Sequence, residues 1–398
     1  MRYEVRGARC EVRGARYEVR RLIVIALMAM LVIACRDDKL MVYPEVYDTG
    51  TTEVVGDIVG MYVLCEGNMG SNKCTVDYLD LVTGKYNRNI YSERNPSTVM
   101  ELGDVGNDIQ VYGSRMWMVI NCSDKVEVVD AKTCRRIGQV NIPNCRNVTF
   151  NDRYAYISSY VGPVDLNAGA QIGMVYKVDT LTLQTVATVE VGYQPEELVI
   201  VGEKLYVANS GGYIAPQYDR TVSVVDLPTM REERKIDVAP NLHRCRADQY
   251  EQLWVSSRGD YDKNPSCITW MQKNAYGKME IGGRIDVAVS DMCIVGDSLY
   301  YYGSEWNEAA QRNTVNYGII NVRTHEVLKT NIFDAKEIAA MRMPYGIIVN
   351  PVGRDFYLMD AKNYVSSGEL LHFKRDGSFD WKVRTGDIPG HGCFIIGN

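Results

Sequence analysis

Residues 194–238 read QPEELVIVGEKLYVANSGGYIAPQYDRTVSVVDLPTMREERKIDV and contain four short segments of alternating or apolar character. The segments are PEELVIVG (195–202), KLYVANSG (204–211), TVSVVDLPT (221–229) and REERKIDV (231–238). Gly202, Gly211 and Pro228 lie at or near the ends of these segments, where turn residues are expected. Four short strands within about 45 residues are typical of one blade of a β-propeller.

The same unit recurs along the chain. GSRMW at 113–117 and GDSLY at 296–300 match GEKLY at 202–206. The aromatic residue of the second strand recurs at seven positions, which are Tyr62, Trp117, Tyr156, Tyr206, Trp254, Tyr300 and Tyr357. The third strand ends in a polar turn at Asp80, Asp130, Asp179, Asp226 and Asn321. The sequence therefore predicts an all-β, seven-bladed β-propeller with four strands per blade.

The two ends of the repeat region complement each other. The first copy begins near residue 60 with a second strand and lacks a first strand, whereas HGCFIIG at 391–397 is similar to the first-strand segment ELVIVG. We expect this C-terminal strand to join the N-terminal blade beside residues 62–66. Such pairing would close the ring and remove two open sheet edges.

Charge and cysteine content exclude several classes of protein. The chain carries a formal net charge of −6, and residues 1–34 hold seven Arg and three Glu, which leaves −10 on the rest. A body this acidic argues against nucleic-acid binding. The 11 cysteines show no CxxC spacing and there are only four histidines, so we expect buried thiols and no metal site. A local bridge, Cys65 with Cys74 or Cys65 with Cys393, stays open.

The N-terminal segment has the features of a lipoprotein signal peptide. Residues 22–34, LIVIALMAMLVIA, form an apolar run after two arginines that is too short to span a bilayer comfortably. The run ends in the small residue Ala34 before Cys35, which resembles a bacterial lipobox. We therefore expect residues 1–34 to be removed and Cys35 to become the lipidated first residue.

Two neighbouring segments refine this interpretation. Residues 3–20 repeat YEVRGAR, CEVRGAR and YEVR, so we expect residues 1–19 to come from a mis-assigned upstream start. RDDK at 36–39 is similar to the signal that exports lipoproteins to the outer surface in Bacteroidetes. The prediction is a lipidated tether over residues 35–53 and a single propeller domain over residues 54–398. The protein would be lipid-anchored in the outer membrane and face the cell exterior.

Candidate binding residues fall on one rim of the ring. In propeller blades the connections from strand two to three and from strand four to the next strand one emerge on the same rim, and here those connections are the long ones. We expect ligand contacts from Asn68, Asn121, Tyr160, Tyr193, Asn209, Tyr213, Tyr261, Trp306, Asn307, Tyr345, Tyr364 and His391. For any single tyrosine, packing between blades is the alternative.

A second candidate set lies at the start of the first strands. We expect these side chains at the funnel mouth around the axis: Asp108, Asn147, Glu197, Arg246 and Asp291. Their neighbours Asn107, Arg146, Glu196 and Arg244 belong to the same positions. A solvated polar channel is the alternative role, so the sequence leaves open whether the rim or the funnel contacts the ligand.

Catalytic motifs are missing from the sequence. It contains no GxSxG, HExxH, P-loop or GxGxxG before a helix. We therefore expect no catalytic residue, no metal and no cofactor, and a binding protein in place of an enzyme.

The blade motif LYVANS with TVSVVD resembles the YncE-like propellers across residues 54–398. The lipobox, the opening YVLCEGNMGSN (62–72) and the ending IPGHGCFI (388–395) look like surface lipoproteins of Bacteroidetes related to BtuG. That resemblance implies capture of a corrinoid, a vitamin B12-like nutrient, and transfer to a TonB-dependent outer-membrane transporter. The alternatives are a glycan- or peptide-binding surface lipoprotein and a lactonase-like propeller enzyme.

Overall fold

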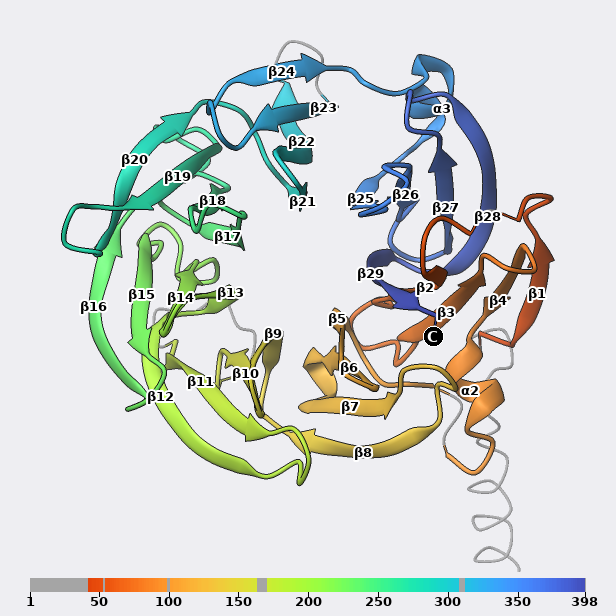
Figure 1. Ribbon diagram of the computed structural model, residues 1–398, viewed down its shortest axis with the longest axis horizontal. Helices are drawn as coiled ribbons and strands as arrows, with labels where there is room; N and C mark the ends of the chain where they lie inside the picture. Colours follow the sequence, from red (N-terminus) through yellow and green to blue (C-terminus); the bar gives the residue numbers. More distant parts are fainter. Residues whose placement is uncertain (1–41, 53, 99–100, 163–169, 308–311, 398) are drawn as a thin grey trace, which may run out of the picture. The chain divides into compact units, whose positions relative to one another are not determined.

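The computed structural model describes residues 42–52, 54–98, 101–162, 170–307 and 312–397. These residues form seven antiparallel sheets arranged as blades around an axis (Figure 1). In each sheet the first strand of the repeat lies nearest the axis and the fourth lies toward the perimeter. The predicted seven-bladed, all-β propeller is confirmed. The expected signal peptide and Cys35 lie outside the described residues.

Blades two to seven each contain four strands in sequence order. Blade two consists of β5 (Gly106–Tyr112), β6 (Arg115–Ile120), β7 (Lys125–Asp130) and β8 (Arg136–Asn141). Blade three consists of β9 (Cys145–Asn151), β10 (Tyr154–Ser159), β11 (Ile172–Asp179) and β12 (Thr185–Tyr193). Blade four consists of β13 (Pro195–Val201), β14 (Lys204–Asn209), β15 (Thr221–Asp226) and β16 (Arg231–Asp237).

The remaining three of these blades follow the same order. Blade five consists of β17 (Leu242–Ala247), β18 (Leu253–Ser257), β19 (Cys267–Lys273) and β20 (Met279–Ile285). Blade six consists of β21 (Asp291–Val295), β22 (Ser298–Asn307), β23 (Arg312–Asn321) and β24 (Val327–Thr330). Blade seven consists of β25 (Pro344–Val349), β26 (Phe356–Asp360), β27 (Ser367–Phe373) and β28 (Phe379–Asp387).

Strands from distant parts of the chain complete the first blade. Its central strands are β2 (Ile58–Cys65), β3 (Thr75–Asp80) and β4 (Lys85–Arg88), and β29 (Pro389–Ile396) takes the first-strand position. β29 pairs antiparallel with β2, with Tyr62 opposite Cys393 and Leu64 opposite His391. The predicted closure of the ring by the C-terminal strand is therefore confirmed.

A fifth strand in this blade departs from the sequence analysis, which placed its residues in a polar tether. β1 (Glu45–Asp48) pairs with β4, with Glu45 opposite Arg88 and Asp48 opposite Lys85. Ion pairs join the same residues across the two strands. Four residues of alternating character are too short a pattern to predict a strand from the sequence. The segment forms a strand because the free edge of β4 supplies its pairing partner.

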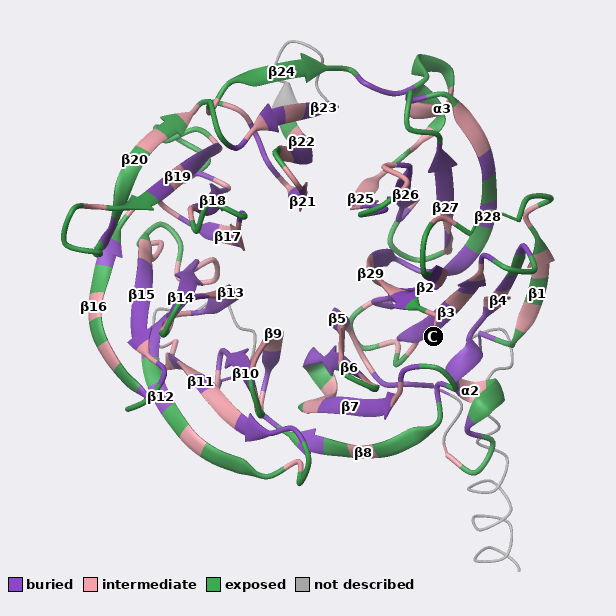
Figure 2. Cartoon of the chain, in the orientation of Figure 1, coloured by how far each residue is buried: buried purple, intermediate pink, exposed green. Residues whose placement is uncertain are grey.

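The hydrophobic core is divided among the junctions between neighbouring blades. The described residues form seven clusters of buried side chains, and each cluster combines side chains from two adjacent blades. All seven recurring second-strand aromatic residues are buried in these junctions, as in the case of Trp117 and Trp254. Figure 2 shows buried residues on the inner and middle strands and more exposed residues on the outer ones. The repeat thus builds a ring in which every blade needs both neighbours.

Short helical segments occur in the connections. They are α2 (Ile90–Arg94), the 3-10 turn η2 (Asn121–Ser123) and α3 (Ala335–Ala340). Within the described ranges, no helix has the length and apolar character needed to cross a membrane.

The nine cysteines of the described region are free thiols. Six of them are buried, and burial raises the pKa of Cys134 and Cys145 to about 12. Cys65, Cys74 and Cys393 carry no bridge in this structure. The six buried thiols act as small apolar side chains, as expected from the sequence.

Candidate functional site

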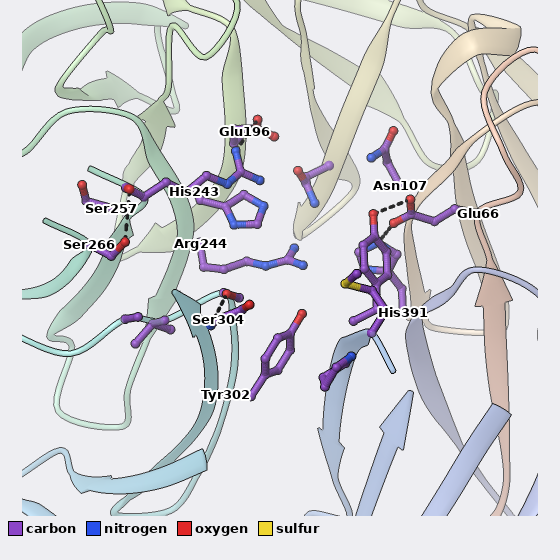
Figure 3. Close-up of a pocket in the computed structure, with 18 of the residues that line it drawn as sticks. Glu66, Asn107, Glu196, His243, Arg244, Ser257, Ser266, Tyr302, Ser304 and His391 are labelled. Carbon is purple, nitrogen blue, oxygen red and sulfur yellow. Dashed lines mark hydrogen bonds and ion pairs between the residues drawn. The ribbon is translucent and has the colours of Figure 1, made fainter. Parts of the chain in front are cut away.

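A polar cavity of about 300 Å³ opens around the axis on the rim that carries the long connections. We call it the axial cavity. Its wall is formed by residues at or near the start of the first strands and by residues of the strand-two-to-three connections (Figure 3). The wall includes Glu66, Asn107, Arg146, Asn147, Glu196, His243, Arg244, Arg258, Tyr261, Tyr302, Tyr345, Tyr364 and His391. The seven first strands converge on the axis, so one repeated position delivers a ring of different side chains to one place.

One wall holds a network centred on Glu196 of β13. Arg146 lies 3.0 Å from the Glu196 carboxylate and also donates to Asn107 at 3.1 Å. The Tyr160 hydroxyl donates to Glu196 at 2.6 Å, and Arg258 lies 3.7 Å away. Burial favours the neutral carboxyl, but the two guanidiniums and the hydroxyl outweigh it and lower the pKa of Glu196. Glu196 is therefore an anion that orients its neighbours.

The opposite wall is built around Glu66, which follows β2. The Tyr345 hydroxyl donates to one carboxylate oxygen at 2.9 Å, and His391 Nε2 lies 3.0 Å from the other. Figure 3 shows the contact between His391 and Glu66 as a dashed line. The Tyr345 ring meets Tyr364 edge to face, with centroids 5.6 Å apart. Gly390 leaves room for the Glu66 carboxylate, because a Cβ at position 390 would lie 2.9 Å from Glu66 Oε1. The strand that closes the ring thus also supplies part of the cavity wall.

His243 and Arg244 extend into the cavity from β17 (Figure 3). Arg244 lies 3.0 Å from Asp291, and its side chain is only 8% exposed. Among the described residues, buried His243 Nδ1 has no hydrogen-bond partner, and Arg244 Nε, the atom nearest Asp291, forms no hydrogen bond of good angle with it. Burial, together with the nearby Arg258, Arg244 and Arg146, holds the pKa of His243 well below its usual range. The imidazole is therefore neutral at pH 7 in the unliganded cavity.

A groove on the rim continues from the axial cavity between blades five and six. The groove has a volume of about 760 Å³ and is lined by Arg258, Tyr261, Asp262, Asn264, Pro265, Ser266, Ser304 and Glu305. We call it the rim groove. Tyr261 stands where the two spaces meet and is 76% exposed. Its ring meets Tyr218 edge to face, with centroids 6.3 Å apart.

A second axial space of about 320 Å³ lies along the first strands and includes Asp108, Arg246, Asp291, His391 and Cys393 in its wall. Three carboxylates of the predicted funnel set join neighbouring blades here. Asp108 accepts from the backbone N–H of Val148, Glu197 from that of Cys245, and Asp291 from that of Ile347. Burial raises the pKa of Glu197 although Arg246 lies 2.9 Å away. These side chains hold first strands in register.

The structure brings part of the predicted rim set to the axial cavity. Tyr261, Tyr345, Tyr364 and His391 line it, together with Asn147 of the funnel set. Asn68 lies beside this group and donates to the backbone oxygen of Tyr364 at 2.8 Å. Whether these residues bind a ligand remains a prediction.

Three predicted rim residues lie inside the fold. Asn121 is buried and donates to Cys145 O at 2.9 Å. Asn209 is buried and donates to the Ser223 hydroxyl at 2.9 Å. Tyr160 is buried behind Glu196, with the Arg146 guanidinium 4.7 Å from its ring centroid. These side chains are therefore not exposed on the rim, because hydrogen bonds within and between blades use their polar atoms, and their contact with a ligand stays a prediction.

The other predicted rim residues lie outside the cavity wall or outside the description. Tyr193 is partly buried at the end of β12, and Tyr213 meets Tyr160 edge to face. The side chains of Trp306 and Asn307 on β22 are outside the described part of the structure.

Sequence reasoning missed several residues of the cavity wall. Glu66, His243, Tyr302 and Ser290 were not selected, although all line the cavity. Glu66 directly follows the second strand of its blade, at the position that Asn121 and Tyr160 occupy in theirs. Alignment of the blades by that position would have identified Glu66.

Comparisons with known proteins show the fold. No family model and no curated protein matches the chain. A quinonprotein alcohol dehydrogenase-like protein from Bacteroides thetaiotaomicron superposes with a TM-score of 0.57 and 11% identity, over 84% of this chain and 78% of that one. The hydrazine synthase of Kuenenia stuttgartiensis gives a TM-score of 0.51 and 17% identity, over 67% and 76% of the two chains. At these identities the likeness concerns the propeller architecture alone.

Proposed function

We propose that the protein is a non-enzymatic capture protein that binds a corrinoid on the rim around the axial cavity. The observation that carries the proposal is the exposed ring of Tyr261 at the junction of the axial cavity and the rim groove. Tyr345 and Tyr364 face the same cavity from blade seven. Flat aromatic surface beside amide, hydroxyl and guanidinium groups suits a broad, largely neutral ring edged with amides. The sequence resemblance supplies the name of the ligand.

We expect different parts of the ligand to occupy the axial cavity and the rim groove, because the two spaces differ in volume. Pockets for drug-sized ligands measure about 300–1,000 Å³, and the axial cavity lies at the lower end of that range. A corrin ring is larger than such ligands and would lie in the rim groove, while one of its side groups enters the axial cavity. This arrangement requires contact with Tyr261.

Titration of the full chain with cyanocobalamin by calorimetry tests the proposal. We expect saturable binding that Tyr261→Ala weakens by roughly tenfold, the loss expected for one well-packed aromatic contact. Tyr276→Ala is the matched control, because Tyr276 is 88% exposed in the turn between β19 and β20 on the opposite rim. Absence of binding, or equal affinity of the two variants, would reject a corrinoid site on this rim.

A glycan is the second candidate ligand, favoured by the residues beside Tyr261. Asp262 and Asn264 line the rim groove next to the exposed ring, and sugars bind where an aromatic face adjoins carboxylate and amide groups. A glycan array discriminates between the two ligands. Glycan binding that Tyr261→Ala abolishes, with no response to cyanocobalamin, would favour this candidate.

Surface anchoring and transfer to a TonB-dependent transporter belong to the same proposal and rest on the lipobox and the resemblance. Cys35→Ala removes the thiol that would carry the lipid. We expect this variant to leave the membrane fraction of the producing cell, whereas the unmodified chain stays with it. Retention of the variant in the membrane fraction would contradict a lipid anchor at Cys35.

A further inference from the structure

The axial cavity contains buried hydrogen-bonding atoms that the protein itself does not use. His243 Nδ1 is buried and has no hydrogen-bond partner among the described residues, and Arg244 Nε lies 3.0 Å from Asp291 Oδ1 but at an angle that forms no hydrogen bond. A buried donor without an acceptor destabilises the fold, so such atoms in a ligand cavity indicate a missing partner. Figure 3 shows both side chains reaching into the space at the axis.

The charges around these two side chains are unequal. Three guanidiniums, those of Arg146, Arg244 and Arg258, face the carboxylates of Glu196 and Asp291. Arg146 is fully engaged with Glu196 and Asn107, whereas Arg258 approaches Glu196 only at 3.7 Å. On this wall three guanidiniums therefore face two carboxylates, and the Glu197 carboxylate lies 4.0 Å from Arg244.

The remaining charged groups lie deeper in the channel or on the opposite wall and have contacts of their own. Deeper in the channel, Arg246 pairs with Glu197 at 2.9 Å, and Asp108 accepts the backbone N–H of Val148. On the opposite wall, Glu66 is held by Tyr345 and His391. These contacts leave the Arg244 side of the cavity as the place where a further negative charge would be stabilised.

We infer that Arg244 and His243, flanked by Arg258, form an oxyanion-binding subsite that takes a carboxylate or phosphate group of the ligand. Guanidinium donors bind such oxyanions through strong charge-assisted hydrogen bonds, and an imidazole adds one further donor. The inference deepens the proposed function and rests on the cavity being a ligand site. It adds a chemical class, because a neutral ligand would offer the guanidiniums of Arg244 and Arg258 no charge-assisted hydrogen bond.

Protonation of His243 is coupled to this binding. His243 faces Arg146, Arg244 and Arg258, as well as Glu196 and His391 across the cavity, and it is neutral without ligand. A bound oxyanion raises the pKa of the imidazole, so the complex takes up a proton. Affinity for the anion should therefore increase as the pH falls from neutral to mildly acidic values.

Sulfate is a suitable probe, because its own charge does not change across that pH range. We expect calorimetry with the full chain to show saturable sulfate binding that tightens at lower pH. Arg244→Gln should weaken it by roughly tenfold or more, as expected for the loss of a charge-assisted hydrogen bond. His243→Gln, which breaks no hydrogen bond of its Nδ1, should remove the pH dependence. Arg153→Gln, on the opposite rim beside Asp179, is the matched control and should bind normally.

Two results would overturn the subsite. The first is no saturable sulfate binding to the unmodified chain, and the second is equal binding by the Arg244→Gln, His243→Gln and control variants, which would indicate an adventitious ion only. If Arg244→Gln fails to fold, His243→Gln and its pH profile decide. His391→Gln must keep the pH dependence, since His391 lies on the opposite wall. Sulfate binding without cyanocobalamin binding would keep the subsite and reject the corrinoid, whereas the reverse would reject the subsite.

Discussion

At the scale of single residues, Asp77 on β3 joins the first blade to the last. Its buried carboxylate accepts from Asn89 N at 2.8 Å, Gly386 N at 2.9 Å and the Tyr86 hydroxyl at 2.8 Å. Burial outweighs these donors and raises the pKa of Asp77. A carboxylate that accepts two backbone N–H groups on different oxygens cannot be replaced by an amide without loss, because the amide has one accepting oxygen.

We therefore expect Asp77→Asn to lower the free energy of unfolding by about 1–3 kcal/mol, the cost of a buried group left unsatisfied. Chemical denaturation measures the difference. Asp237→Asn makes the same chemical change at an exposed ion pair with Arg220 and should cost less than about 1 kcal/mol. Equal effects of the two substitutions would mean that the hydrogen bonds of Asp77 contribute little.

The sequence predicted the kinds of side chain in the cavity wall better than it predicted which residues lie there. Aromatic and polar residues on the long connections indicated a polar site on one rim, and Tyr261, Tyr345, Tyr364 and His391 do line the axial cavity. Asn209 has the same composition signal, but Ser223 and Gly192 occupy its polar atoms. A single sequence does not separate these cases, because the partner that buries a side chain comes from another strand or blade.

At the scale of the element, the third strand of a blade repeatedly ends in one kind of turn. The side-chain oxygens of Asp80, Asp130, Asp179, Asp226 and Asn321 accept from the backbone N–H groups two or three residues later. Asparagine forms the turn as well as aspartate does, since the accepting oxygen is common to both. The Asp or Asn that recurs at the end of the third strand is therefore explained by the hydrogen bonds that its side chain accepts in this turn.

This equivalence predicts different outcomes for two substitutions at one position. Asp130→Ala removes hydrogen bonds to Thr133 and Lys132 and should lower the free energy of unfolding by roughly 1 kcal/mol. Asp130→Asn keeps the accepting oxygen and should cost markedly less. Thermal unfolding of both variants at neutral pH provides the comparison, and a larger loss for asparagine would contradict the turn model.

The same turns make stability sensitive to acid. Hydrogen bonds from the turn lower the pKa of Asp130 and Asp179, and Lys204 with Thr229 lowers that of Asp226 to about 2. A lowered pKa in the folded state means that the stabilisation is present above about pH 4 and is lost as the pH falls toward 2. Replacement of these three aspartates by asparagine should flatten the dependence of unfolding free energy on pH over that interval. An unchanged slope would assign acid sensitivity to other carboxylates.

At the scale of the whole molecule, each blade is stabilised by the next one, and the ring depends on its closure. The seven apolar clusters each lie between two blades, so a blade whose neighbour is lost exposes a full apolar face. The repeat made this architecture predictable, since seven copies of one unit that cannot bury its own face must stack. The position of β1 was not predictable in the same way, because it occurs once.

A single substitution in β29 should weaken the closure of the ring while the strand stays in place. A Cβ on Gly392 of β29 would lie 2.6 Å from Tyr62 O and 2.5 Å from the Ile348 side chain. Gly392→Ala should therefore push β29 away from β2 and lower the melting temperature by several degrees, roughly the shift for a loss of 1–2 kcal/mol. At Gly212 the nearest atoms would lie 3.5 Å away, so Gly212→Ala should melt close to the unmodified chain.

Removal of residues 390–398 tests the closed ring directly. The deletion takes away nearly all of β29, leaves the inner edge of β2 unpaired and uncovers the cluster that contains Ile395. We expect a loss of more than about 5 kcal/mol, which is comparable with the whole stability of a domain, and hence no cooperative melting transition.

A synthetic peptide of residues 388–398 should restore the transition by strand addition to β2, because the free edge presents unpaired backbone groups. A control chain lacking only the last residue should melt normally. If the truncated chain melts like the full chain and ignores the peptide, the blades are stable without closure, and Glu66 then holds its place in the axial cavity without His391.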